Sequence, residues 1–72
     1  MPAIALTNEQ KVNKRMKELT EDTRSKLYKK RIKQEAVADA AGISQSAVAN
    51  QFRRGQLTLS VYLAAQLLLE EQ

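Results

Sequence analysis

Helix-breaking residues are almost missing from this chain, and their placement constrains its fold more than any other feature. The 72 residues contain one proline, at position 2, and two glycines, Gly42 and Gly55. Proline and glycine are the residues least compatible with a helix interior, and both glycines follow stretches with a helical apolar pattern. This arrangement is typical of helices joined by short turns, without a linker, so we expect one domain over residues 1–72.

A domain of this size has only a small core to stabilise it. The sequence has no cysteine and no histidine, so neither a disulfide framework nor the usual zinc ligands can reinforce the fold. Helix packing must then supply the stability, often with help from self-association. We therefore predict an all-α fold, a compact bundle of four to five helices, without a metal or a cofactor.

The apolar residues form no segment suited to a membrane. No apolar run approaches the roughly 20 residues of a membrane span. The first ten residues, MPAIALTNEQ, lack the basic start and the apolar stretch of a signal peptide. Together with the absence of cysteine, which fits a reducing compartment, this indicates a cytoplasmic protein without a membrane partner.

The charge is positive and unevenly placed. The formal net charge is +4, and residues 24–33 (RSKLYKKRIK) hold six basic residues and no acidic one. Arg53 and Arg54 form a second basic point. Such clusters favour an acidic partner such as nucleic acid, although a basic run can equally be the solvated face of a helix.

The residue types needed for enzyme chemistry are scarce. Without histidine or cysteine, the common pairs of nucleophile and base are missing. Two separated glycines cannot form a glycine-rich phosphate loop. We therefore expect no catalytic residue, no enzyme activity and no small-molecule substrate.

The first half of the chain predicts helix after a short arm at residues 1–6, which we expect to be flexible. Thr7 with Gln10 fits a capping box, so a helix should begin directly after Thr7. Thr20 is a second candidate cap, because two acidic residues follow it, where the helix dipole favours them. The pattern leaves open whether residues 8–31 form one helix or two.

The clearest local signals come next. Residues 34–41 are rich in alanine and predict a short helix, and Gly42 suits the left-handed position that ends it. Ile43 is expected to be a buried plug in the turn. Ser44 is a good N-cap for a third helix over residues 45–53.

Residues 34–54 fit a helix-turn-helix. This motif needs a small residue where its helices cross, which Ala38 supplies, and inward apolar residues on its second helix, which Val48 and Phe52 supply. The outward positions must be short or polar to meet DNA bases, and they are Gln45, Ser46, Ala49 and Asn50. Amide side chains can bond adenine through two hydrogen bonds, and serine can bond a base or a phosphate.

The C-terminal stretch is ambiguous. Apolar residues alternate over residues 57–63, which predicts a strand. Residues 61–69, rich in alanine and leucine, instead give a helix with a wide apolar face, and Thr58 or Ser60 can cap it. The composition of this second half favours the helix, whose apolar stripe would pack on the core, form a dimer contact, or do both.

These stretches resemble a known family. QEAVADAAGISQSAVANQF, with its Gln-Ser pair at Gln45 and Ser46, and TLSVYLAAQLLLEE are similar to the DNA-binding domain of the phage lambda repressor and to related Cro-type helix-turn-helix proteins. The similarity covers roughly residues 32–70, with a weaker echo in LTNEQ near the start. It implies a lambda-repressor-like bundle that binds double-stranded DNA.

The resemblance also implies roles for individual residues. Base contacts would come from Gln45, Ser46, Ala49 and Asn50. Phosphate contacts would come from Lys33, Gln34, Arg53 and Arg54. Gln34 would in addition brace Gln45. In such an interface the phosphate contacts set the position on the duplex and the base contacts set the choice of sequence.

Two departures limit what the resemblance implies. The loop after Phe52 reads Arg-Arg-Gly-Gln, where the repressor has a shorter Asn-Gly turn, so contacts from this loop do not transfer. The family repressor also continues into a further helix and a separate dimerisation domain. The resemblance therefore does not indicate how two copies of this chain would pair.

One function and one alternative follow from the sequence. The main hypothesis is a transcriptional regulator, a phage or prophage repressor of the Cro type, bound as a homodimer to a near-palindromic operator. The alternative is a helix-turn-helix protein-interaction module, such as an antitoxin or an adaptor, that uses the apolar stripe. A non-specific nucleic-acid coat needs stacking aromatic side chains, but Phe52 is needed for the core, and Tyr28 and Tyr62 are expected to be partly buried.

Overall fold

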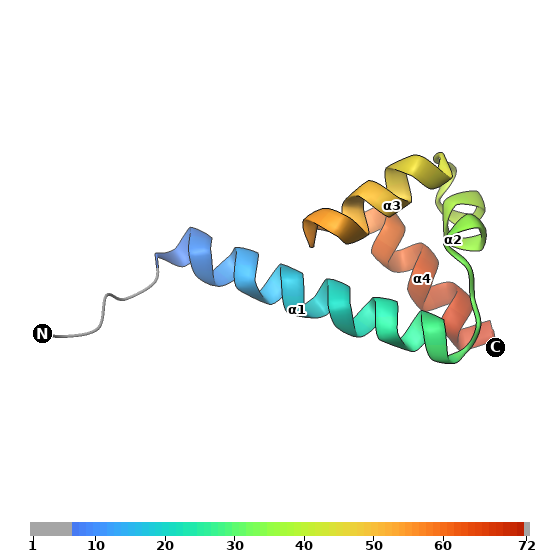
Figure 1. The fold of residues 1–72 in the computed structure, drawn as a ribbon, viewed down its shortest axis with the longest axis horizontal. Helices are drawn as coiled ribbons and strands as arrows, with labels where there is room; N and C mark the ends of the chain where they lie inside the picture. The colour runs from blue at the N-terminus through green and yellow to red at the C-terminus, as the bar shows by residue number, and fades with distance from the viewer. Residues whose placement is uncertain (1–6, 72) are drawn as a thin grey trace, which may run out of the picture.

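The protein is all-helical, as the sequence predicts. The computed structural model describes residues 7–71, which form four helices: α1 (Asn8–Lys29), α2 (Gln34–Ala41), α3 (Gln45–Arg54) and α4 (Leu59–Glu71) (Figure 1). The arm expected at residues 1–6 lies outside the described part. Within residues 7–71, no helix is long and apolar enough to cross a membrane.

α1 is one continuous helix, which settles the question left open for residues 8–31. It begins with the predicted capping box: the Gln10 N–H donates to the Thr7 hydroxyl at 3.1 Å, and the Thr7 N–H donates to the Gln10 side chain at 2.9 Å. Thr20 is not a cap. It is buried in the middle of α1, where its hydroxyl donates to the Met16 carbonyl at 2.6 Å, so its polar group is satisfied without a break in the helix.

A residue with left-handed backbone follows within two residues of the end of each of the first three helices. These residues are Arg31 (φ 58°), Gly42 (φ 73°) and Gly55 (φ 73°). In each turn the next amide donates back to a carbonyl of the last helical turn: Ile32 to Leu27 (2.9 Å), Ile43 to Ala38 (3.1 Å) and Gln56 to Gln51 (3.1 Å). This is the Schellman arrangement, which reverses the chain sharply and satisfies carbonyls that would otherwise lack partners.

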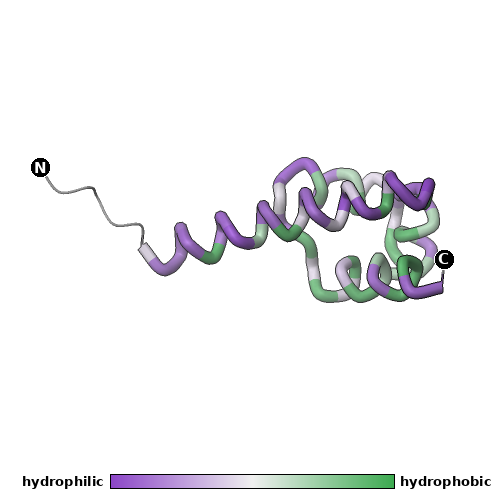
Figure 2. The backbone as a smooth tube through the Cα atoms, turned by 90° about the horizontal axis from the view of Figure 1, so that it is seen from below, coloured by the Kyte–Doolittle hydropathy of each residue, from purple (hydrophilic) through white to green (hydrophobic). Residues whose placement is uncertain are grey.

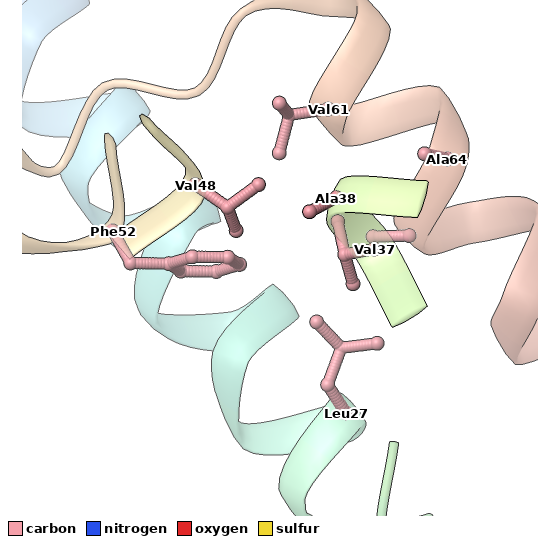
Figure 3. Packing of buried hydrophobic residues seen from close by; sticks show 8 residues of the cluster. Leu27, Val37, Ala38, Val48, Phe52, Val61 and Ala64 are labelled. Atoms are coloured by element: carbon pink, nitrogen blue, oxygen red, sulfur yellow. The ribbon is translucent and has the colours of Figure 1, made fainter. Parts of the chain in front are cut away.

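The four helices meet at one small apolar core. α2 packs against α3 and α4, and α1 packs against the same two helices. The buried apolar residues are Leu27, Val37, Ala38, Val48, Phe52, Val61, Ala64 and Ala65. Figure 3 shows Leu27, Val48 and Phe52 gathered around Val37 of α2. Ala38, Val48 and Phe52 are all buried, which confirms the predicted inward positions.

α4 is a helix, and the alternating apolar residues at 57–63 do not form a strand. Thr58 caps it, because the Thr58 hydroxyl accepts a hydrogen bond from the Val61 N–H at 3.4 Å. Val61 is fully buried. The outward leucines, four residues apart, are Leu59, Leu63 and Leu67, with exposed fractions of 72%, 55% and 50%. Residues at that spacing share one face of a helix, so α4 has an apolar face on the core and another toward solvent.

Two of the expected burials are wrong. Ile43 is 36% exposed, so its side chain is not a buried plug, and the turn is closed by the hydrogen bond from its amide to the Ala38 carbonyl. Tyr28 is 83% exposed. Leu27 takes the inward position on α1, and the next residue on a helix is rotated by about 100° away from it. Tyr62 is partly buried, as predicted.

The outline is elongated because α1 is longer than the rest of the bundle. The principal extents are 49 × 22 × 16 Å. The N-terminal half of α1 runs beyond α3 (Figure 1) and is mainly hydrophilic (Figure 2). The buried residues of α1 are Thr20, Thr23 and Leu27, all in its C-terminal half. This half therefore supplies the residues of α1 that are buried in the core.

The surroundings of Gly42 and Gly55 predict different losses of stability when each is replaced by alanine. Alanine at either site would hold a left-handed backbone, at a cost of roughly 1–2 kcal/mol. A Cβ at Gly42 would meet nothing within 4 Å, whereas one at Gly55 would lie 3.1 Å from Lys17 Cγ and 3.4 Å from Lys17 Cα. We expect Gly55→Ala to lower the free energy of unfolding by about 1 kcal/mol more than Gly42→Ala, in urea titrations followed by circular dichroism. Equal losses would contradict the close approach of α1 to Gly55.

Candidate nucleic-acid interface

α3 packs on the core along one face and exposes the opposite face to solvent. Ser44 caps the helix as predicted, because its hydroxyl accepts a hydrogen bond from the Ala47 N–H at 3.2 Å. Val48 and Phe52 anchor the opposite face in the core. A helix anchored along one face presents its other face to solvent. The cap and the two anchors therefore fix where α3 begins and how it is rotated about its axis.

The predicted base-contacting residues lie toward the outer side of α3. Gln45, Ser46 and Asn50 are exposed. Ala49 is half-buried, so its methyl group borders the exposed face and does not protrude from it. The sequence of α3 contains no acidic residue that would repel a polyanion. This face can donate and accept hydrogen bonds through two amides and one hydroxyl.

An open hollow of about 740 Å³ lies beside the start of α3. It forms where the end of α1, the α1–α2 connection and the first residues of α2 and α3 come together. Its lining residues are Tyr28, Lys29, Arg31, Ile32, Lys33, Gln34 and Gln45. The structure thus brings two predicted phosphate-contacting residues, Lys33 and Gln34, next to Gln45 at the start of the predicted base-contacting face.

Four residues of the hollow, Tyr28, Lys29, Arg31 and Ile32, were not predicted to belong to the site. Lys29 and Arg31 are members of the basic run at residues 24–33, but the run does not indicate which of its side chains would lie near α3. Tyr28 was expected to be partly buried and was given no function. Placing these four residues requires the path of the chain from α1 to α2, which no local sequence signal specifies.

The expected brace between Gln34 and Gln45 is not formed. Both residues line the hollow, but none of the side-chain hydrogen bonds among residues 7–71 joins them. Gln34 is half-buried and Gln45 is exposed. The two amides are therefore available to a ligand in the hollow separately.

Basic residues flank α3 at both ends. Lys33 lies beside its start, and Arg53 and Arg54 are exposed in its last turn. Gln45 and Arg53 are eight residues apart, which is about 12 Å along a helix. The major groove of DNA is also about 12 Å wide. Basic groups at both ends of a polar helix therefore suit the two phosphate backbones on either side of that groove.

The cations of this surface form no ion pair within the part of the chain that the structure describes. The one ion pair of residues 7–71 joins Lys26 to Asp22 at 3.0 Å, on α1. Cations grouped on one surface attract polyanions. Over the same residues, no group of three potential metal ligands lies together.

Gln51 joins α3 to α4, a role that no sequence signal indicated. Its side-chain oxygen accepts a hydrogen bond from the Thr58 N–H at 2.9 Å and lies 3.3 Å from the Thr58 hydroxyl, which donates to it as well. These bonds span the loop in which the sequence departs from the lambda-repressor pattern. They fix the C-terminal end of α3, where Arg53 and Arg54 lie.

Comparison with known proteins gives no match: no family model matches the sequence, and no curated protein or solved structure is similar enough to establish a relationship. The resemblance to the lambda repressor thus stays a prediction that rests on the residues quoted for it.

The hydrogen bonds between Gln51 and Thr58 predict different effects on stability for two substitutions of similar size at Gln51. Gln51→Leu removes the acceptor and should lower the free energy of unfolding by about 1 kcal/mol, because the Thr58 N–H loses its partner. Gln51→Glu keeps an acceptor oxygen and should stay close to the parent. Urea unfolding of the three proteins checks this. A Gln51→Leu variant as stable as the parent would show that the bond contributes nothing.

Proposed function

We propose that this protein is a sequence-specific transcriptional regulator that binds double-stranded DNA, a cytoplasmic repressor of the Cro type from a phage or a prophage. The observation that carries the proposal is the outer face of α3. It presents the amides of Gln45 and Asn50, together with the hydroxyl of Ser46. Basic groups stand at both ends of this face, and no acidic residue interrupts it.

In this proposal α3 enters the major groove and the surrounding residues hold the phosphates. Gln45 and Asn50 read adenine edges through paired hydrogen bonds, and the Ala49 methyl packs near a thymine methyl. Phosphate contacts come from Lys33, Gln34, Arg53 and Arg54. A protein seated on an operator excludes other proteins from it, so repression is the simplest output of a domain this small.

We further propose that two copies bind together. One α3 contacts few base pairs, so useful affinity needs two chains on a near-palindromic site, with half-sites about one helical turn apart. The contact between the chains is assigned to the leucine face of α4, formed by Leu59, Leu63 and Leu67. A two-fold axis at Leu63 would bring Leu59 of one chain against Leu67 of the other, which makes the face complementary to itself.

Charge and area favour a second copy as the occupant of the leucine face. No charged residue occurs from Gly55 to Leu69, so this surface suits neither DNA nor an anionic membrane. Three partly exposed leucines bury much less than the roughly 800 Å² that each partner of a stable interface buries. The dimer should therefore be weak in solution and form on DNA, where neighbouring half-sites raise the effective concentration of the second chain.

The leucine face is also the observation that favours the alternative, a protein-interaction module such as an antitoxin or an adaptor. In that case a different chain would cover the leucines, and α3 would need neither base-reading amides nor flanking cations. The polar and basic surroundings of α3 make DNA binding the better supported function.

Selection from a random pool of double-stranded DNA tests the proposed function directly. We expect the sequences bound at about 0.15 M salt to be enriched in a two-fold symmetric motif, with half-sites about one helical turn apart. Gln45→Ala should then lose roughly 1–3 kcal/mol on the selected site and blur the preference at one or two base pairs.

Two outcomes of the selection would count against this function. Binding without enrichment would indicate a charge-driven coat, and no binding would favour the interaction module. If Gln45→Ala weakens binding equally on every sequence, Gln45 does not read bases.

The absence of cysteine from the chain allows one introduced cysteine to report on the dimer contact. We expect Leu63→Cys to form a disulfide-linked dimer on oxidation, since a residue on a two-fold axis lies within disulfide reach of its own copy. Leu19→Cys, at another exposed apolar position, is the matched control and should remain monomeric on non-reducing gels. Leu63→Glu should fold normally and lose affinity for the two-fold site. Equal cross-linking of both cysteine variants, or full affinity of Leu63→Glu, would contradict the α4 contact.

A further inference from the structure

Arg31 has a backbone conformation that favours glycine. Its φ of 58° makes it the one non-glycine residue with positive φ among residues 7–71. A left-handed backbone is unfavourable for a residue with a Cβ atom, because the Cβ crowds the following carbonyl. The corresponding turns after α2 and α3 have glycine, at Gly42 and Gly55.

The turn itself does not require an arginine. The Arg31 N–H donates to the Tyr28 carbonyl at 3.0 Å, and the Ile32 N–H donates to the Leu27 carbonyl at 2.9 Å. Both bonds are between backbone groups, so glycine at position 31 would make them equally well. The closure of α1 therefore gives no reason for this side chain.

No ion pair within the described residues explains the arginine either. Arg31 is exposed, and the one ion pair of the described residues joins Lys26 to Asp22. The favourable effect of a cation near a helix C-terminus is already supplied by Lys26 and Lys29 in the last turn of α1. Folding alone would thus be better served by glycine at this position.

The surroundings of the Arg31 side chain give a different reason for an arginine at this position. Arg31 lines the hollow beside α3 together with Lys29, Lys33, Gln34 and Gln45. We propose that Arg31 binds a DNA phosphate in this hollow and that the strained backbone is retained for this contact. The guanidinium group is suited to phosphate, because it is always charged and can donate two parallel hydrogen bonds. Strained residues persist where function requires them.

This inference rests on the proposed function and adds a phosphate-binding residue to it. Two glycine substitutions test it. Arg31→Gly removes both the strain and the cation. Lys30→Gly removes the same charge from the neighbouring position, which has an ordinary φ of −88° and is not among the residues that line the hollow.

We expect the two variants to move in opposite directions in thermal unfolding. Both substitutions remove one charge from the basic segment, but only glycine at position 31 also relieves a left-handed backbone. Arg31→Gly should therefore raise the melting temperature by a few degrees, whereas Lys30→Gly should lower it, because glycine at position 30 relieves no strain and adds freedom to the unfolded chain. On the selected operator, Arg31→Gly should reduce the slope of log affinity against log salt by about 0.9 for each bound chain. Lys30→Gly should leave this slope close to that of the parent.

The outcomes separate this inference from the proposed function. An unchanged or lowered melting temperature of Arg31→Gly would overturn the strain argument, and a salt slope equal to that of Lys30→Gly would overturn the phosphate contact. If the parent protein binds duplex DNA without sequence preference, the proposed function is wrong, but the role of Arg31 is still tested, because the slope of log affinity against log salt can be measured on any duplex. A parent that binds no duplex DNA would overturn both.

Discussion

The packing of α2 at Ala38 determines the direction of α3, and with it where the predicted base-contacting residues lie. Val37 and Ala38 are buried in the core, where α2 packs against α3 and α4, and a small side chain at position 38 leaves room for this packing. Because only three residues separate α2 from α3, this packing sets the direction of α3. It also brings the start of α2 beside the start of α3, which is how Gln34 and Gln45 come to line one hollow. A larger side chain at this position would move the two predicted contact groups apart.

The features that could be predicted from the sequence are those set by short-range interactions. Capping by Thr7 and Ser44 depends on hydrogen bonds between residues three apart, and a left-handed turn at Gly42 depends on the freedom of one residue. The outer face of α3 follows from the positions of Val48 and Phe52, since helical periodicity relates the inward and outward residues. For this reason the bounds of α2 and the start of α3 agree with the prediction.

Features that depend on how distant segments pack could not be predicted in this way. The hydroxyl of Thr20 can cap a helix or bond within one, and its burial against the other helices decides between them. The sequence gives no distance between Gln51 and Thr58, so their hydrogen bonds carried no signal. Tyr28 has the apolar character of a core residue, but Leu27 already fills the inward position. The hollow itself combines three segments that are separate in the sequence.

The α1–α2 connection links the stability of the protein to its charge. Lys29, Lys30, Arg31 and Lys33 crowd one short segment at the end of α1. The helix dipole offsets only part of their mutual repulsion, and no carboxylate among residues 7–71 forms an ion pair with them. A bound polyanion would relieve this repulsion and would bind the folded chain in preference to the unfolded one, which stabilises the fold by mass action. Since a core this small leaves little stability to spare, the occupied interface would contribute a large share of the total.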